Sequence, residues 1–270
     1  MSLKEKKDKS EKLSPHSLLK KFSSKKGDKE PINQKFDSEK VAFASKTDSN
    51  KENPVFEDFL HNVKKACTDT NLAENIDLLS TPQLSDALQK LTGSNGVIPL
   101  LKSVNGQKVF GKVFTAITHE LDWGTSVKAI DSASEGQVIF ISVDGNENAV
   151  WGELTSKTAQ MKGISGTIIH GACRDLGALK EMDYPVFSTN IVPNAGKPLL
   201  EGEINAKINL EGIAVNPGDY ILGDECGVVL IPQDVFVDVI KIIWEIKNSE
   251  KDIISQISKG RSLLEILNMD

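Results

Sequence analysis

The sequence predicts an α/β protein whose sheets contain both parallel and antiparallel strands. Helical and strand patterns alternate in the middle of the chain, and several short strand patterns cluster after residue 203. Alternation predicts parallel strands joined by helices, whereas clustered strands predict hairpins. The length of 270 residues allows one large domain or two small ones.

The chain carries no pattern typical of export or membrane insertion. It has no apolar run of the length that a transmembrane helix needs, and its first residues, MSLKEKKDKSEK, lack the apolar segment of a secretory signal. The three cysteines, Cys67, Cys173 and Cys226, are odd in number and far apart, which excludes a disulfide scaffold and a paired-cysteine zinc site. We therefore expect a cytoplasmic protein that does not bind membranes.

Charge divides the chain into two parts. Residues 1–54 hold 14 Lys and 9 acidic residues, a net charge of +5, while the other 216 residues hold 18 basic and 29 acidic residues, a net charge of −11. The first part has few large apolar residues, so we expect 1–54 to be a disordered Lys- and Ser-rich tail and 55–270 to form one folded domain. The tail is either a polybasic arm for RNA or an acidic partner, or a solubilising segment without a ligand. The second reading is favoured because the tail has no Arg, and the acidity of 55–270 argues against nucleic-acid binding by the folded domain.

In the first half of the folded domain, apolar spacing and turn residues predict three helices and two strands. The second helix is expected to have Thr81 as its N-cap and Pro82 at its first position. The helices are expected at 55–67, 82–91 and 124–133, and the strands at 107–118 and 137–143.

In the second half, two helix–strand units are followed by a hairpin and C-terminal helices. The units are expected at 151–162 with 166–170 and at 175–182 with 186–189. The run Gly223–Gly227 lies between two β-rich segments and predicts a hairpin turn. The final helices are expected to run from Pro232 to about 247 and from 249 to about 258.

The scarcity of arginine draws attention to one dipeptide. Only two of the 32 basic residues are Arg, namely Arg174 and Arg261, so an Arg in this chain suggests a need for a planar group with fixed donors. Arg174 is followed by Asp175 at the end of a predicted strand, where α/β proteins usually bind ligands. The alternative is a structural Arg–Asp pair in which Asp175 caps the next helix.

Predicted lengths bring a second group of residues to the same place. A helix that starts near Gly152 and the strand that returns after it are each roughly 16–20 Å long. The helix start, Gly152-Glu153-Leu154-Thr155, is therefore expected beside Arg174 and Asp175. Free N–H groups at a helix start suit a carboxylate, and acidic side chains suit a hard cation, so this arrangement suits a metal-bound 2-oxo acid.

Three segments resemble the family of the regulator of ribonuclease E activity A, which includes the 4-hydroxy-4-methyl-2-oxoglutarate aldolases. They are DGNENAVWGELTSKTA (144–159), GISGTIIHGACRDLGALKEMDYPVF (163–187) and VNPGDYILGDECGVVLIP (215–232). The segment STPQLSDALQKL (80–91) resembles the opening helix of the family. The resemblance covers about 75–269 and implies a swivelling β/β/α-type domain with extra terminal helices, assembled as a homotrimer with sites between subunits.

The resemblance also implies roles for individual residues. The turn Gly152-Glu153-Leu154-Thr155 would bind pyruvate through its N–H groups, Arg174 would contact the substrate and Asp175 would ligate Mg²⁺ or Mn²⁺. An acid near the C-terminus of a neighbouring subunit would hold metal-bound water, and spacing to Gly260 places it at Glu250.

Two departures from the family pattern bear on activity. Glu153 stands where the family usually has Asp, and Ala178 stands where the aldolases have an acid three residues after the Asp of the Arg-Asp pair. We expect a divalent-metal-dependent lyase that acts on pyruvate-derived 2-oxo acids, with Glu153 and Arg174 as catalytic residues and oxaloacetate decarboxylation favoured over aldol cleavage. The alternative is a non-catalytic regulator that binds a ribonuclease or another protein.

Other candidate residues have structural explanations that we favour. His170 is a candidate phosphohistidine, but it lacks a Gly-rich histidine motif, so ordinary packing is the expected role. Cys173 has no His at a spacing that suggests a dyad, and Asp224 and Glu225 are expected to be hairpin-turn residues.

Overall fold

The computed structural model of the protein describes residues 53–66 and 78–269. The tail expected at 1–54 therefore lies almost entirely outside the described residues. Ten strands form one mixed sheet, and two more form a separate hairpin. The α/β class with mixed sheets is confirmed.

The centre of the large sheet is parallel and its flanks are antiparallel. The order is β1-β12-β11-β3-β4-β6-β7-β2, with β5 beside β6 and β8 beside β3. The parallel pairs are β3–β4, β4–β6, β5–β6 and β6–β7. The strands are β1 (Val97–Ile98), β2 (Lys102–Ser103), β3 (Val109–His119), β4 (Val138–Asp144), β5 (Ala149–Trp151), β6 (Gly166–Cys173), β7 (Val186–Ile191), β8 (Glu203–Ile204), β9 (Ile208–Leu210), β10 (Ile213–Val215), β11 (Tyr220–Asp224) and β12 (Gly227–Ile231).

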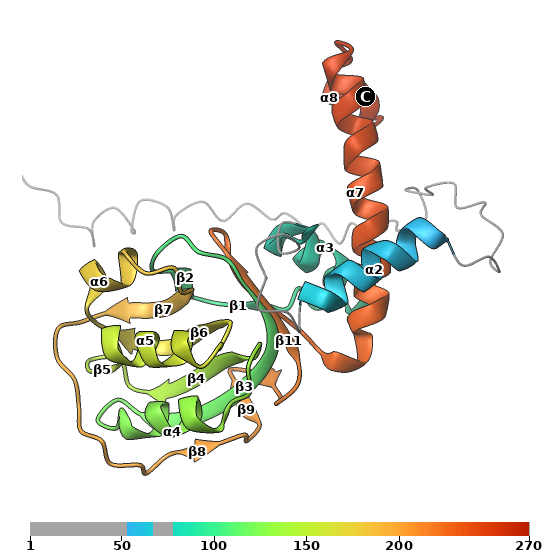
Figure 1. Ribbon diagram of the computed structural model, residues 1–270. Coiled ribbons are helices and arrows are strands. Elements are labelled where there is room, and N and C mark those ends of the chain that lie inside the picture. Colours follow the sequence, from blue (N-terminus) through green and yellow to red (C-terminus); the bar gives the residue numbers. More distant parts are fainter. Residues whose placement is uncertain (1–52, 67–77, 270) are drawn as a thin grey trace, which may run out of the picture. The chain divides into compact units, whose positions relative to one another are not determined.

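Helices cover the sheet on two sides. Figure 1 shows α4 and α5 in front of β4 and β6, and α2, α3 and α7 gathered beside the β11 end of the sheet. The helices are α2 (Pro54–Ala66), α3 (Thr81–Thr92), α4 (Gly124–Ser132), α5 (Glu153–Met161), α6 (Leu176–Lys180), α7 (Phe236–Ser258) and α8 (Leu263–Ile266).

Three buried apolar clusters show how these layers pack. The first joins α2, α3 and α7 to β11 and β12, and includes Leu84 and Val239. The second packs α4 and α5 onto the parallel strands through residues such as Ile130. The third lies between the parallel strands and the antiparallel end of the sheet, where Phe187 and Ile221 belong to one cluster. The second and third clusters thus lie between helices and strands and between two groups of strands, which agrees with the β/β/α layering that the resemblance implies, while α2, α3 and α7 form an additional group of helices at the antiparallel end.

Most predicted elements are present, but three details were wrong. Helix α3 begins at Thr81 itself, with Ser80 at the N-cap position, and its first N–H is bonded by a distant carboxylate rather than by a local cap. Trp151 lies in strand β5, so the helix after it starts only at Glu153. The two C-terminal helices expected to meet near residue 248 are one helix, α7, because no Gly or Pro interrupts 236–258.

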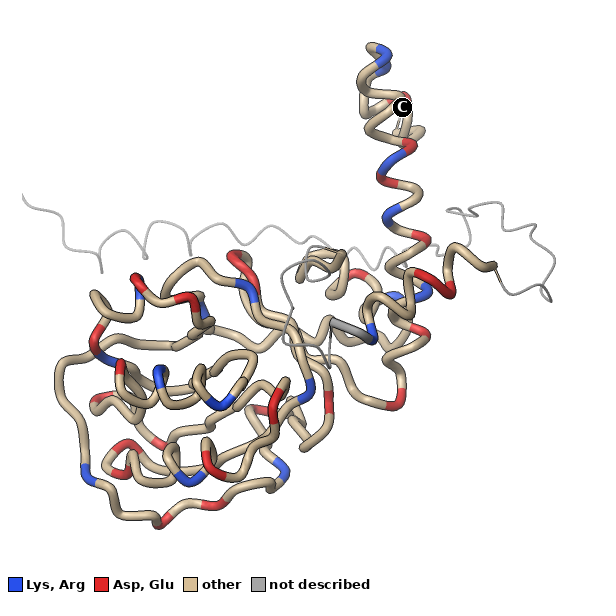
Figure 2. Tube along the Cα trace, in the orientation of Figure 1, with Lys and Arg blue, Asp and Glu red and all other residues tan. Residues whose placement is uncertain are grey.

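Helix α7 is the longest described helix, but its sequence does not suit a bilayer. Acidic and basic positions alternate along it (Figure 2). Among the described residues, no helix combines the length and the apolar character that a membrane span requires.

Candidate functional site

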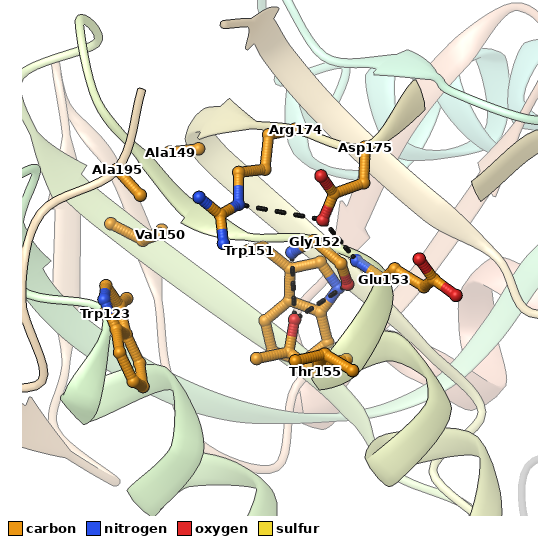
Figure 3. Close-up of a pocket in the computed structure, with 11 residues that line it drawn as sticks. Trp123, Ala149, Val150, Trp151, Gly152, Glu153, Thr155, Arg174, Asp175 and Ala195 are labelled. Carbon is orange, nitrogen blue, oxygen red and sulfur yellow. Dashed lines mark hydrogen bonds and ion pairs between the residues drawn. The ribbon is translucent and has the colours of Figure 1, made fainter. Parts of the chain in front are cut away.

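The predicted site residues other than Glu250 meet in a pocket at the carboxyl ends of the parallel strands. The cavity has a volume of about 380 Å³. Its polar side is formed by Gly152, Glu153, Leu154, Thr155, Arg174 and Asp175 (Figure 3). The other lining residues are Trp123, Ala149, Val150, Trp151 and Ala195.

Strand pairing explains why these distant segments meet. Strand β5 runs parallel to β6, with Trp151 opposite Cys173, so both strands end at the same edge of the sheet. The N–H of Arg174 donates to the carbonyl of Trp151 over 3.0 Å, which joins the two strand ends. The structure therefore brings 152–155 beside 174–175, as the predicted element lengths required.

The side chain of Thr155 hydrogen-bonds the start of its own helix, α5. The hydroxyl of Thr155 accepts the N–H of Gly152 and donates to the Gly152 carbonyl, each over 2.9 Å. This hydroxyl is consequently engaged by the turn. The N–H groups of Leu154 and Thr155 have no acceptor within the helix, because the first turn of any helix lacks one, so they are the donors available to an anion.

Asp175 does not act as the cap that its position suggests. It stands at the N-cap of α6, but its side chain makes no bond to that helix, and its backbone adopts the left-handed region with φ 61° and ψ 37°. Its Oδ2 instead accepts the N–H of Glu153, the first residue of α5, over 3.1 Å. A non-glycine residue in this backbone region costs about 1–3 kcal/mol and is typical of functional sites.

Arg174 completes the polar side of the pocket. Its Nε lies 3.7 Å from Oδ2 of Asp175, and the two side chains are 44% and 39% exposed, so both can reach a ligand. Figure 3 shows the guanidinium extending from Asp175 toward Trp123 and Val150. One planar cation thus lies between the carboxylate and the apolar side of the pocket.

Gly152 allows this close approach. A Cβ at position 152 would lie 2.5 Å from Oδ2 of Asp175 and 3.1 Å from Cγ of Arg174. Any larger residue would displace the carboxylate or the arginine. The glycine is therefore required by the space between the two strand ends, and its backbone is otherwise extended.

Glu153 is oriented away from the centre of the pocket. Its carboxylate forms an ion pair with Lys157, one helical turn further along α5. Figure 3 shows it pointing away from the Arg174 guanidinium. The backbone of Glu153 thus belongs to the turn that is expected to bind an anion, whereas its side chain must leave Lys157 before it can reach the pocket.

The donor set fits a hydrated hard cation rather than an enclosed metal. No group of three or more His, Cys, Asp or Glu side chains that could hold an ion occurs in 53–66 or 78–269. Asp175 offers its other oxygen, Oδ1, to which no described group hydrogen-bonds. Mg²⁺ is commonly held by one or two carboxylates, with water and substrate oxygens in the remaining positions, so Asp175 suits Mg²⁺ or Mn²⁺.

Glu250 is not part of the pocket within one chain. It lies on α7, where its carboxylate accepts a hydrogen bond from Gln83 of α3. Its expected role concerned a neighbouring subunit and stays a prediction.

The burial and hydrogen bonds of Cys173, His170 and Asp224 agree with the structural roles expected for them. Cys173 is buried in the second apolar cluster, and burial raises the pKa of its thiol. Burial lowers the pKa of His170, which is half-buried on β6. Asp224 accepts a hydrogen bond from the N–H of Cys226 within the hairpin turn, as expected. It also accepts hydrogen bonds from the N–H and the hydroxyl of Thr81, which fixes the start of α3.

The sequence did not predict that Trp123 lines the pocket. Trp123 follows the carboxyl end of β3, at the same sheet edge as Arg174, and its Nε1 donates to the Gly196 carbonyl over 3.2 Å. The preceding residue, Asp122, is buried and accepts N–H groups from Gly124 and from residues 199–201. A tryptophan at the end of a predicted parallel strand was the available signal, but its partners lie more than 70 residues away.

Comparison with known proteins shows the family to which related chains belong. Residues 81–230 match the family model described as RraA-like: Aldolase/RraA. An uncharacterized protein of Methanocaldococcus jannaschii is 41% identical over 194 residues, which cover 71% of this chain and 91% of that protein. The 4-hydroxy-4-methyl-2-oxoglutarate aldolase of Thermus thermophilus is 30% identical over 57% of this chain and 92% of its own length.

Solved structures show the same fold. A protein from Pseudomonas syringae superposes with a TM-score of 0.64 and 27% identity, covering 76% of this chain and 96% of that one. The RNA-processing inhibitor RraA from Thermus thermophilus superposes with a TM-score of 0.50 and 27% identity, over 55% of this chain and 92% of its own.

Proposed function

This chain belongs to the RraA-like family, and from that premise we propose that it is a divalent-metal-dependent lyase that cleaves a carbon–carbon bond in pyruvate-derived 2-oxo acids. The observation that carries the proposal is the contact between Asp175 and the first N–H of α5, with Arg174 beside it in one pocket. This contact supports the proposal because the proposed cation ligand, the proposed anion-binding turn and a guanidinium would all be within reach of one small molecule. Family relatives named as aldolases support the same reaction class.

Substrate binding follows from the polar side of the pocket. The N–H groups of Leu154 and Thr155 would hold the carboxylate of the 2-oxo acid at the positive end of the helix dipole. Asp175 would ligate Mg²⁺ or Mn²⁺ directly, and Glu153 would do so through water. When bound, the cation supplies Lewis-acid polarisation of the 2-oxo group.

The chain's own residues then stabilise charge and move a proton. In oxaloacetate, the C3–C4 bond breaks, CO₂ leaves and the bonding electrons move to the C2 oxygen. Arg174 stabilises that developing negative charge as a preorganised donor. A proton delivered to C3 gives pyruvate. Apart from Asp175, Glu153 is the only carboxylate among the described residues that line the pocket, and it would deliver this proton once its side chain leaves Lys157.

Aldol cleavage of 4-hydroxy-4-methyl-2-oxoglutarate requires one further group. The C4 hydroxyl must lose a proton while the C3–C4 bond breaks to give two molecules of pyruvate. At position 178, on α6, this chain has Ala, which cannot accept a proton. Decarboxylation needs less of the site, and we therefore rank it above cleavage of this substrate.

The test is pyruvate formation from oxaloacetate with Mg²⁺ or Mn²⁺, measured against the same metal without protein. EDTA and the Asp175→Asn substitution should each reduce the protein-dependent rate to background. Asp183→Asn, which changes an exposed Asp near α6, is the matched control and should keep the wild-type rate. Equal rates for Asp175→Asn and wild type would contradict the proposal.

A regulator without turnover is the second candidate, and Ala178 is the observation that favours it. A relative in the family is named as an RNA-processing inhibitor. A protein partner retained by Arg174→Ala and Asp175→Asn variants, together with no protein-dependent pyruvate release, would support this candidate over the lyase.

We also propose the homotrimer that the family resemblance implies, with sites between subunits. Glu250 of the partner subunit would then supply the distant carboxylate. Light scattering checks the subunit number, and the trimer predicts that Glu250→Gln lowers activity without changing that number. Activity unchanged in Glu250→Gln would remove this residue from the site.

A further inference from the structure

The side chain of Glu153 is held outside the pocket to which its backbone belongs. Its N–H donates to Oδ2 of Asp175 over 3.1 Å, so the backbone lies directly beside the proposed cation ligand. Its carboxylate instead forms an ion pair with Nζ of Lys157, which is not among the described residues that line the pocket. Glu153 is therefore attached to the site through its backbone and to a group outside the pocket through its side chain.

The position of Lys157 on α5 accounts for the direction of the Glu153 side chain. The two residues are four positions apart, so their side chains lie on one face of the helix, and a glutamate that precedes a lysine by four residues is the favourable order. The helix dipole favours a carboxylate at the first position of α5, but it does not select the direction in which that carboxylate points. The described contact that selects this direction is the ion pair with Lys157.

The ion pair can open without a change in the backbone. The side chains of Lys157 and Glu153 are 55% and 37% exposed, so water competes for both charges, and exposed pairs of this kind contribute little to stability. A glutamate side chain turns about several single bonds, whereas the hydrogen bond to Asp175 involves only the backbone of Glu153. The carboxylate can therefore change partners while the turn at the start of α5 stays in place.

A divalent cation on Asp175 would compete with Lys157 for the same carboxylate. Such a cation carries a larger charge than an ammonium group, and Coulomb attraction is proportional to the charge. It would also lie close to the backbone of Glu153, because that backbone already contacts Asp175. Cation binding thus favours the Glu153 carboxylate inside the pocket, and the ion pair with Lys157 opposes that position.

We propose that Lys157 is a positioning residue whose ion pair with Glu153 keeps that carboxylate out of the pocket until a divalent cation binds at Asp175. This inference rests on the proposed lyase function and adds a control of the same site. The pair acts as an autoinhibitory contact, because it must open before Glu153 reaches the cation and the substrate. It also lowers the affinity for the cation, since the opening of the pair opposes binding.

The affinity of the full chain for Mn²⁺ tests the proposal. Lys157→Gln removes the pair and should lower the Kd for Mn²⁺, measured by calorimetry. It also removes the repulsion between the lysine and the cation, so the same substitution is measured in Glu153→Gln, which has no such ion pair. The factor by which the Kd falls should be about twofold larger with Glu153 present, as expected from the usual strength of exposed pairs at this spacing. Equal factors in the two backgrounds would overturn the proposal.

Two further lysine variants separate the ion pair from net charge. Lys157→Arg keeps a cation that can hold Glu153 and should retain the wild-type Kd. Lys128→Gln removes one exposed lysine from the neighbouring helix α4 and should leave the Kd unchanged. A Kd lowered as much by Lys128→Gln as by Lys157→Gln would assign the effect to net charge and overturn the proposal.

Chemical labelling of lysines reports the opening of the pair without turnover. Mg²⁺ should increase the rate at which Nζ of Lys157 is methylated by formaldehyde and a borohydride, with the modified residue located by mass spectrometry. Lys128 is the internal control and should react at the same rate with Mg²⁺ and with EDTA. An unchanged rate at Lys157, in protein that binds Mg²⁺, would overturn the proposal.

The outcomes distinguish this proposal from the lyase. Coupling between Lys157 and Glu153 in Mn²⁺ binding, without pyruvate release from any 2-oxo acid, would support the autoinhibitory contact and overturn the lyase. Pyruvate release that requires Mg²⁺, without such coupling, would overturn the contact and leave the lyase intact. No binding of Mn²⁺ at millimolar concentration would overturn both.

Discussion

Asp175 stands at the start of one helix and caps another: its Oδ2 accepts the N–H of Glu153, the first residue of α5, over 3.1 Å. The carboxylate proposed to hold the cation therefore also bonds the turn proposed to bind the substrate carboxylate. One hydrogen bond thus connects the proposed cation site to the proposed substrate site, and substitutions at either end should have distinct and measurable effects.

Substitutions of Asp175 should separate stability from activity. Asn tolerates the left-handed backbone and can still accept the Glu153 N–H, so Asp175→Asn should change the free energy of unfolding by less than about 0.5 kcal/mol while abolishing metal-dependent activity. Asp175→Ala loses the cap and adds backbone strain, and should destabilise by about 2 kcal/mol. Urea unfolding at one protein concentration measures both, and equal losses for Ala and Asn would contradict the strained backbone.

Gly152→Ala should disable the site. The added Cβ would displace Oδ2 of Asp175 or Cγ of Arg174, so kcat/KM should fall at least about tenfold. Gly177→Ala is the matched control, because a Cβ there meets nothing within 4 Å. Wild-type activity in Gly152→Ala would show that the approach of Asp175 to the α5 turn is not required.

Substitution of Arg174 should lower kcat much more than it lowers the stability of the fold. Arg174→Ala should lower kcat by about 10²–10³-fold, the usual effect of removing one donor to a developing oxyanion. Arg174→Lys should recover part of the activity, since a lysine keeps the charge but not the planar arrangement of donors. The other arginine, Arg261, contacts Gln256 outside the pocket, and Arg261→Ala should have no effect. A change in KM alone would assign Arg174 to ground-state binding.

Asp122 should make stability depend on pH. Burial alone would raise its pKa, but hydrogen bonds from Thr125, Leu200 and Glu201 outweigh burial and hold the pKa well below its ordinary value. The folded-state pKa is lowered, so the stabilisation is fully present above about pH 4, the unfolded value, and is lost as the pH falls toward the folded value.

The Asp122→Asn variant tests this account. It should be destabilised by about 3 kcal/mol at pH 7, because the buried N–H donors lose a charged acceptor. Between about pH 5 and pH 2 its stability should fall less steeply than that of wild type. Asp183→Asn, at an exposed position, should follow the wild-type curve, and parallel curves for all three proteins would contradict the lowered pKa.

Local patterns predicted the elements that frame the site. Strand β6 and helix α5 follow from apolar runs and from Gly163, which separates them, and each depends mainly on neighbouring residues. The scarcity of arginine singled out Arg174 without any structural information. These inferences succeeded because helix and strand periodicity are properties of short segments.

Long-range contacts decided what local patterns could not. The start of α3 depends on Asp224, 143 residues after Thr81, so local rules placed its cap one residue too late. The position of Trp123 depends on a carbonyl at Gly196, 73 residues away. Pairwise contacts of this kind leave no periodic trace in the sequence.

By itself, the sequence determined the α/β class, the order of most helices and strands, and the residues of the polar side of the pocket. Only the tertiary structure decided that Asp175 caps α5 rather than α6, that Glu153 turns toward Lys157, and that Trp123 lines the same pocket as Arg174. The physical reason is that backbone periodicity is encoded locally, whereas the direction of a side chain and the groups that face it depend on how distant strands end at one edge of the sheet.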